Sequence, residues 1–244
     1  PRTDVPSSGM LLSCLLYPVG PAAIILMPMI VGGLIDSYGF SEQQAGNIAA
    51  LEGLGLVFAS MLAAAWIRRV SWVKALLVAF LGYAALNILS ANIEAYVPLL
   101  VLRCLTGLAG GSVMAVTVAA LGDQREPDRA FGLAQAVQGV MMLGGFLAAP
   151  WLVQRWGVSA IYYMLAGASL LMMLTLPRFP LAGRVRAAAT RENALQAGHA
   201  GLIWLGLFAS VLFFVNVFGF WAFVERIGQA GGLPAQTIAL ALGI

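Results

Sequence analysis

The chain has 244 residues, of which 61% are hydrophobic and only 9% are charged, and its mean hydropathy is +0.92. A soluble domain carries roughly 25% charged residues, so the charges here are too few to cover a surface that faces water. The formal net charge is +3, but the basic residues stand between apolar runs and form no single patch. This distribution argues against nucleic acid as a partner.

Long apolar runs follow one another along the chain. A helix needs about 20 mostly apolar residues to cross a hydrocarbon core of about 30 Å, whereas strands of a membrane barrel are about ten residues long and alternate in polarity. The runs are of the first kind, and their glycines and prolines are tolerated in a bilayer. The sequence therefore predicts an all-α polytopic membrane protein with seven spans, at approximately 9–35, 43–66, 75–93, 96–121, 130–153, 157–176 and 200–223, and an eighth that begins near Pro234.

The Lys and Arg residues lie mostly at one end of these spans. Ten of the thirteen fall before the first span or in the connections after the second, fourth and sixth spans. Only Arg155 and Arg226 fall in connections at the other end, and Arg103 lies within the fourth span. Because cytoplasmic loops carry the excess of basic residues, we expect a plasma-membrane protein, in a bacterial inner membrane, with a cytoplasmic N-terminus.

The stretch 177–198 is the only long polar connection, and it follows six spans, as an interdomain linker would. The junction GGLPAQTIALAL after the seventh span resembles the earlier junction YGFSEQQAGNIAAL, with Gly39 aligned to Gly232. Ser41 and Gln44 are predicted to form a capping box in the earlier junction. So short a match also arises by chance, but with six spans and a basic linker it favours parallel six-helix repeats. We expect a six-helix bundle over 1–177, a cytoplasmic linker over 178–198, and the incomplete start of a second bundle over 199–244.

Two ionisable residues lie clearly within spans, Glu52 in the second and Arg103 in the fourth. Such groups are costly in a bilayer and are functional candidates by default. At about 1.5 Å per residue, Glu52 lies about 16 Å below Ser41 and Arg103 about 12 Å below Ala95, so their depths permit an ion pair. The pair is either the proton-binding site of a proton-coupled carrier or a permanent structural salt bridge.

The first span contains Pro18, Pro21 and Pro28. Each proline removes a backbone donor, so we expect the helix to bend and expose carbonyls. Exposed backbone is tolerated only where it lines a cavity or meets protein, which makes the three prolines candidates for a substrate cavity. The alternative is a helix that is merely kinked. Asp36, at the outer end of this span, is predicted to be a solvated end charge rather than a gate residue.

Polar side chains of later spans are further candidates for the cavity. These are Gln135 and Gln138 in the fifth span and Asn216 in the seventh, and hydrogen bonds between helices are the alternative role for them. Asn87, Tyr162 and Tyr163 are polar residues of the same kind, with no assigned role.

Small residues are expected to bring helices close together. Gly107 and Gly111 stand at GxxxG spacing with Gly110 between them, and Gly144 and Gly145 lie in the fifth span. Cys14 and Cys104 lie in apolar runs and indicate neither a disulfide nor a metal site. With His199 as the only histidine, no metal centre and no cofactor are expected.

The layout of six spans, a long cytoplasmic linker and a repeat resembles the major facilitator superfamily over the whole chain. The best local match is 99–111, LLVLRCLTGLAGG, which is similar to that family's Arg-x-x-x-Gly-x-small-small pattern. The resemblance implies a six-helix bundle of that type, followed by the seventh span and the start of the eighth. In the family the intramembrane arginine is associated with proton coupling, which implies a similar role for Arg103.

Two motifs depart from the family's pattern. The loop between its second and third spans is Gly-x-x-x-Asp-Arg-x-Gly-Arg-Lys, whereas residues 64–74 are AAWIRRVSWVK. The gate-loop residues are Arg68, Arg69 and Lys74. Arg69 matches the pattern, but Arg68 occupies the acidic position and Ser71 that of the second glycine, so a latch that uses this carboxylate is not expected. The exporters' Gly-Pro-x-x-Gly-Gly appears without its proline at 144–149, which weakens the case for an exporter.

The resemblance implies a secondary transporter that moves a small solute by alternating access. No Gly-x-x-x-x-Gly-Lys-[Ser/Thr] sequence is present, so a proton gradient is the expected energy source. An enzyme is not expected, because metal clusters, paired aspartates and Ser/His sites are lacking in the sequence. The alternative is a membrane scaffold or sensor. The expected partners are the lipid bilayer, a small-molecule solute, protons and the remainder of a C-terminal bundle, because the family has twelve spans.

Overall fold

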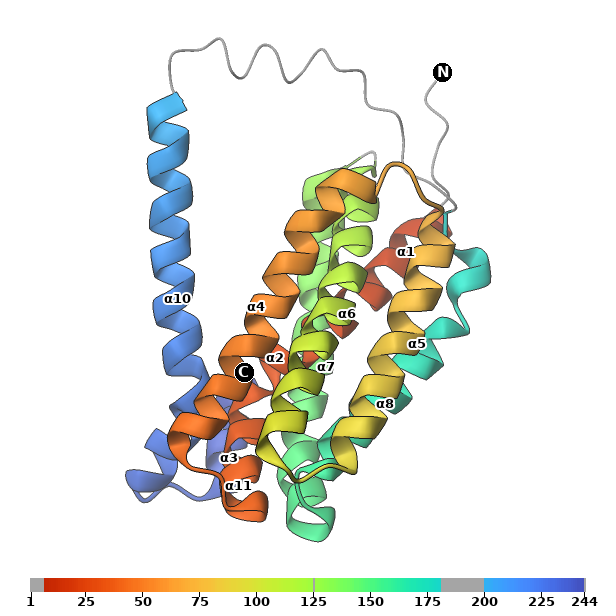
Figure 1. Ribbon diagram of the computed structural model, residues 1–244. Helices are drawn as coiled ribbons and strands as arrows, with labels where there is room; N and C mark the ends of the chain where they lie inside the picture. The colour runs from red at the N-terminus through yellow and green to blue at the C-terminus, as the bar shows by residue number, and fades with distance from the viewer. Residues whose placement is uncertain (1–6, 125, 181–199, 244) are drawn as a thin grey trace, which may run out of the picture.

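The computed structural model describes residues 7–124, 126–180 and 200–243, and all regular structure in these ranges is helical (Figure 1). Most of the predicted linker, with Arg2, Arg125 and His199, lies outside them. The helices in chain order are α1 (Ser7–Leu16), η1 (Tyr17–Val19), α2 (Ala22–Ile25), α3 (Met27–Tyr38), α4 (Glu42–Trp66), α5 (Trp72–Ala91), α6 (Tyr96–Gly122), α7 (Pro127–Trp156), α8 (Ser159–Met173), η2 (Leu176–Arg178), α10 (Ala200–Ala230) and α11 (Ala235–Gly243).

The second to fifth predicted spans are the single helices α4, α5, α6 and α7. Within the described residues these four helices are long and apolar enough to cross a membrane, and α8 is a shorter apolar helix of 15 residues. The predicted all-α polytopic class is therefore confirmed. Helices α4 and α5 both pack on α6, and α8 packs on α5 (Figure 1).

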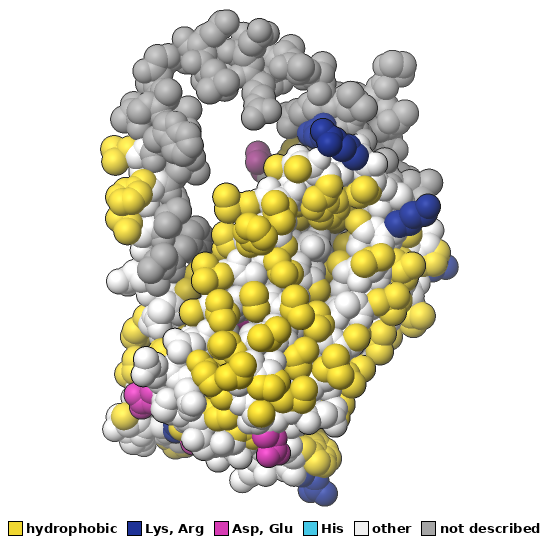
Figure 2. All heavy atoms as spheres, in the orientation of Figure 1, with side chains coloured by type: hydrophobic (Ala, Val, Ile, Leu, Met, Phe, Trp, Pro, Cys, Tyr) yellow, Lys and Arg dark blue, Asp and Glu magenta, His cyan; other side chains and the backbone are white. Residues whose placement is uncertain are grey.

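Large apolar side chains cover the outer surface of this bundle. Phe58 and Met61 of α4, Val78 of α5 and Val101 of α6 are all exposed. Figure 2 shows hydrophobic side chains spread over the face formed by these helices, with Lys and Arg gathered towards its ends. A surface of this kind is unsuited to water and matches the hydrocarbon region of a bilayer.

The first span is not one helix but four pieces, α1, η1, α2 and α3. Pro18 lies in η1, Pro21 is the N-cap of α2, and Pro28 lies in the first turn of α3. A proline lacks an N–H and suits the start of a helix, so each proline coincides with the beginning of a new piece. The expected bend is thus a series of interruptions.

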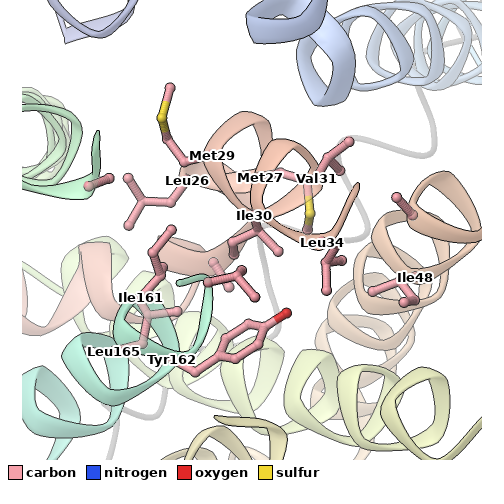
Figure 3. Close-up of a cluster of buried hydrophobic side chains, with 14 of the residues drawn as sticks. Leu26, Met27, Met29, Ile30, Val31, Leu34, Ile48, Ile161, Tyr162 and Leu165 are labelled. Carbon is pink, nitrogen blue, oxygen red and sulfur yellow. The ribbon is translucent and has the colours of Figure 1, made fainter. Parts of the chain in front are cut away.

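The last of these pieces, α3, forms the centre of the largest apolar core. Ile30 and Leu34 are fully buried, and they lie between Ile161 and Tyr162 of α8 on one side and Ile48 of α4 on the other (Figure 3). The core therefore connects the broken first span to helices that follow it in the sequence.

The turns that follow α3 and α10 repeat one backbone geometry. Gly39 closes α3 with φ of 67°, and Gly232 follows α10 with φ of 81°, a conformation that glycine adopts at little cost. After the first of these turns, Ser41 and Gln44 form the predicted capping box, which is confirmed. The two glycines are the pair that the sequence repeat aligned.

The seventh span extends further than the sequence indicates. Its apolar run ends near residue 223, but α10 continues to Ala230 because only the Gly231–Gly232 pair turns the backbone. Arg226, expected in the connection, is therefore on the helix. It lies beside α3, because the C-terminal part of α10 contacts that helix (Figure 1).

Candidate functional site

The two ionisable residues of the spans meet inside the first bundle. Arg103 of α6 donates two hydrogen bonds to Glu52 of α4, from Nε to Oε2 at 3.1 Å and from Nη2 to Oε1. The side chains are 0% and 2% exposed. This fork-to-fork arrangement is the strong geometry for an arginine and a carboxylate, and both charges are removed from solvent.

Helix α5 supplies further acceptors for Arg103. Arg103 Nη1 donates to Asn87 Oδ1 at 2.9 Å and, at the longer distance of 3.5 Å, to Ser90 Oγ. Asn87 in turn donates to the Tyr83 carbonyl within α5. The guanidinium therefore has oxygen partners on two helices, of which only Glu52 is charged.

An aromatic ring covers the guanidinium as well. Cζ of Arg103 lies 4.7 Å from the centre of the Tyr162 ring, which α8 contributes. A cation in this position is attracted by the ring face. The Tyr162 hydroxyl is buried without a hydrogen-bond partner in the described part of the chain. The site thus draws on α4, α5, α6 and α8.

Close contact of α4 with α6 places Glu52 beside Arg103. A side-chain carbon added at Gly107 would collide with the Glu52 carbonyl, and one added at Gly111 would collide with the Leu56 carbonyl. From the opposite helix, Gly55 faces the Cys104 carbonyl in the same way. The backbones touch where these glycines meet, at the level of the ion pair.

The other three predicted packing glycines differ in what surrounds them. Gly110 faces the Gly20 carbonyl at the break in the first span, and Gly145 faces Leu26. Gly144 has open space where a side chain would be, and it lines a cavity instead.

The candidate cavity residues do not converge on one place. Pro18 and Gln138 line a cavity of about 170 Å³ between the broken first span, α7 and α8, together with Met141, Met142 and Met164. Pro28 is buried in the core, and Gln135 and Asn216 are exposed. Pro21 is partly buried at the start of α2 and does not line this cavity.

The gate-loop residues lie together at the opposite end of α4 from Ser41. Arg68 and Arg69 are in the turn after α4, and Lys74 is in the first turn of α5. All three are exposed, and Figure 2 shows basic side chains at this end of the apolar face.

Several residues at these contacts were not singled out by their sequence pattern. Asn87 and Tyr162 stood out only as polar residues without a role, and Ser90 and Glu225 did not stand out at all. Asp36, expected to be a solvated end charge, is indeed more than half exposed but pairs with Arg226 of α10. The prediction missed this partner because it placed Arg226 beyond the helix.

Helices long and apolar enough to cross a membrane, with an ion pair buried among them, define an integral membrane protein. The chain belongs to the Major Facilitator Superfamily, whose family model matches residues 12–244. This is a family of membrane transporters and not of enzymes, as the sequence predicted.

Three known proteins are similar to this chain. A gallate transporter of Pseudomonas putida is 29% identical over 188 residues, which cover 75% of this chain and 41% of that protein. The crystal structure of a D-xylose-proton symporter matches 97% of this chain and 64% of its own, with a TM-score of 0.68 and 14% identity. A peptide transporter, crystallised as its E310Q mutant with sulfate, matches 95% of this chain and 52% of its own, with a TM-score of 0.53 and 18% identity. The two structures support the fold, and the chain spans less than half of the gallate transporter.

Proposed function

We propose that the full protein is a proton-coupled secondary transporter that moves a small organic solute by alternating access. The observation that carries the proposal is the buried pair of Glu52 and Arg103, joined by two hydrogen bonds and surrounded by neutral partners. A carboxylate buried in a membrane bundle can bind and release a proton when its basic partner has other groups to interact with.

Arg103 has such alternatives. A proton on Glu52 would cancel the charge that holds Nε and Nη2, while Nη1 keeps its bond to Asn87 and the ring of Tyr162 still faces the cation. The neutral partners therefore lower the cost of opening the pair. All of these groups belong to the first bundle, so protonation would act by rearranging helices within it.

The gallate transporter suggests which solute to test first. The identity of 29% over three quarters of the chain favours a small aromatic carboxylate as the solute class. The cavity beside Gln138 offers one amide among methionine, proline and glycine, a lining that suits an apolar ring better than a sugar.

The distribution of basic residues supports the orientation proposed from the sequence. Arg68, Arg69 and Lys74 lie at the end of the bundle that is opposite to the turns at Gly39 and Gly232. With basic loops in the cytoplasm, the proposed location of the N-terminus is cytoplasmic. The similarity to a protein of Pseudomonas putida favours a bacterial inner membrane.

Proteoliposomes containing the full-length protein test the function. We expect an imposed inward proton gradient to drive accumulation of radiolabelled gallate, and Glu52→Gln to abolish accumulation while leaving exchange of gallate for gallate. Glu42→Gln, which changes an exposed acid in the first turn of the same helix, is the matched control and should behave like the natural protein.

Two outcomes would contradict the proposal. Undiminished proton coupling in Glu52→Gln would make the pair a permanent structural salt bridge. Absence of flux for gallate and for a panel of aromatic acids, sugars and peptides would instead favour a scaffold or sensor of the same fold.

A further inference from the structure

A second contact between distant parts of the chain lies where the C-terminal half of α10 meets α3 and the end of α2 (Figure 1). Trp221 Nε1 donates to the carbonyl of Ile25 at 3.0 Å, and Arg226 Nη2 donates to Asp36 Oδ1 at 2.8 Å. We call this contact the outer clasp. It joins the first bundle to the first helix of the second.

Glu225 lies inside the outer clasp between these two interactions. The residue is only 8% exposed. Its Oε1 accepts a hydrogen bond from Gln229 at 3.2 Å, whereas Oε2 is buried without a hydrogen-bond partner in the described residues. A side-chain carbon at Gly32 would stand 2.7 Å from this oxygen, so the carboxyl group occupies space that only glycine leaves on α3.

The neighbouring charges offset that of Glu225 only in part, because Arg226 favours its ionised form whereas Asp36 and burial oppose it. From α3 it faces Asp36, which has the same sign, and the other ionisable residue of that helix, Tyr38, is bonded to Ser159. On its own helix, Arg226 directs Nη2 to Asp36 and Nη1 to Gln229. The packed helix α11 has no ionisable residue. A buried carboxylate with an unpaired oxygen is unfavourable, and a bound proton lowers that cost because it removes the charge.

We propose that Glu225 is a second proton-binding residue, separate from Glu52, whose neutral form holds α3 and α10 together and whose ionised form releases them. The role of this switch rests on the proposed alternating-access transport. A proton that enters from the outer side would then close the outer end behind an incoming solute.

Distance measurements on the full-length protein in liposomes test this switch without any solute. Spin labels at Asn92→Cys and Leu233→Cys place one probe on the outer turn of each bundle, after Cys14, Cys104 and other native cysteines are replaced. We expect one short distance at acidic pH and a growing population of longer distances as the pH rises. In Glu225→Gln the distance should stay short at every pH.

The substitution Asp36→Asn should shift the opening of the outer clasp in the opposite direction to Glu225→Gln. It removes the like charge and frees Arg226 to pair with Glu225, so ionisation becomes easier and opening should begin about one pH unit lower. In the double variant with Glu225→Gln the pH dependence should vanish again, which shows that Asp36 acts through Glu225. If Glu225→Gln does not fold, Glu225→Met is the replacement, uncharged and of similar length.

The proposal is overturned if the distance in the natural protein is independent of pH, if Glu225→Gln still opens at high pH, or if Asp36→Asn shifts opening upwards. These results are independent of transport. Absence of solute flux would remove the proposed function and leave the distances unchanged, whereas a failure of the outer clasp would leave the Glu52→Gln result intact.

Discussion

Arg103 shows how a full charge is kept inside a membrane protein. Its guanidinium uses Nε and Nη2 for Glu52, uses Nη1 for Asn87 and lies over the ring of Tyr162. A lysine would supply a single point charge and could not make this planar set of contacts. The residue type therefore matters as much as the charge.

The ring of Tyr162 is predicted to stabilise the protein, and its hydroxyl group is predicted to contribute no stability. We expect Tyr162→Leu to lower stability by roughly 2 kcal/mol, the contribution of a desolvated cation–π contact. Tyr162→Phe keeps the ring face and loses a hydroxyl that has no hydrogen-bond partner within the described residues, so it should be neutral. Thermal unfolding of the purified full-length protein in detergent measures both. Equal effects of the two substitutions would show that the ring face contributes nothing.

At this scale the sequence identified the charged residues and not the neutral ones. Glu52 and Arg103 stand out because charges are rare within spans, whereas one asparagine, serine or tyrosine in a span has many ordinary roles. Glu225 was overlooked for another reason. It follows the apolar run, and nothing in its immediate sequence shows that α3 covers it.

Helices α4 and α6 are the elements that fix the site. Their glycines allow backbone contact, so the position of Glu52 relative to Arg103 depends on residues that carry no chemistry. The sequence predicted Gly107 and Gly111 as packing residues but not their partner helix, because spacing along one helix does not identify its neighbour. Gly55 on α4, which completes the contact, was not predicted.

A methyl group at this contact should separate the two helices. We expect Gly107→Ala to lower the melting temperature and to reduce transport, because the Glu52 carbonyl must move away and its side chain moves with it. Gly139→Ala, on α7 with open space around it, is the matched control and should be neutral or slightly stabilising, since alanine favours helix. A Gly107→Ala protein as stable and active as the control would show that the close approach is dispensable.

For the whole molecule, the helical class and most span boundaries could be predicted because bilayer thickness dictates apolar length. The interruptions of the first span could be predicted only as bends, since three prolines do not show which neighbours fill the gaps. The division of the chain into two bundles by a linker at 178–198 stays a prediction. The positive φ that Gly39 and Gly232 share, at the turns aligned by the sequence repeat, favours it.

The orientation gives a prediction at this scale. A membrane-impermeant maleimide added to intact cells should label Asn92→Cys, in the outer turn between α5 and α6, and should not label Val70→Cys until the cells are made permeable. The natural protein is the control for Cys14, which is buried, and for Cys104, which is partly buried. The reverse labelling pattern would invert the topology.

The broken first span also has a consequence for how the protein is made. The carbonyl of Ile25 is bonded to the indole of Trp221, and 196 positions separate the two residues. At a synthesis rate of about 5–20 residues per second, the donor leaves the ribosome roughly 10–40 s after the acceptor. During that interval the membrane offers this carbonyl no hydrogen bond of its own. Until Trp221 has been translated, the Ile25 carbonyl therefore needs another hydrogen-bond donor.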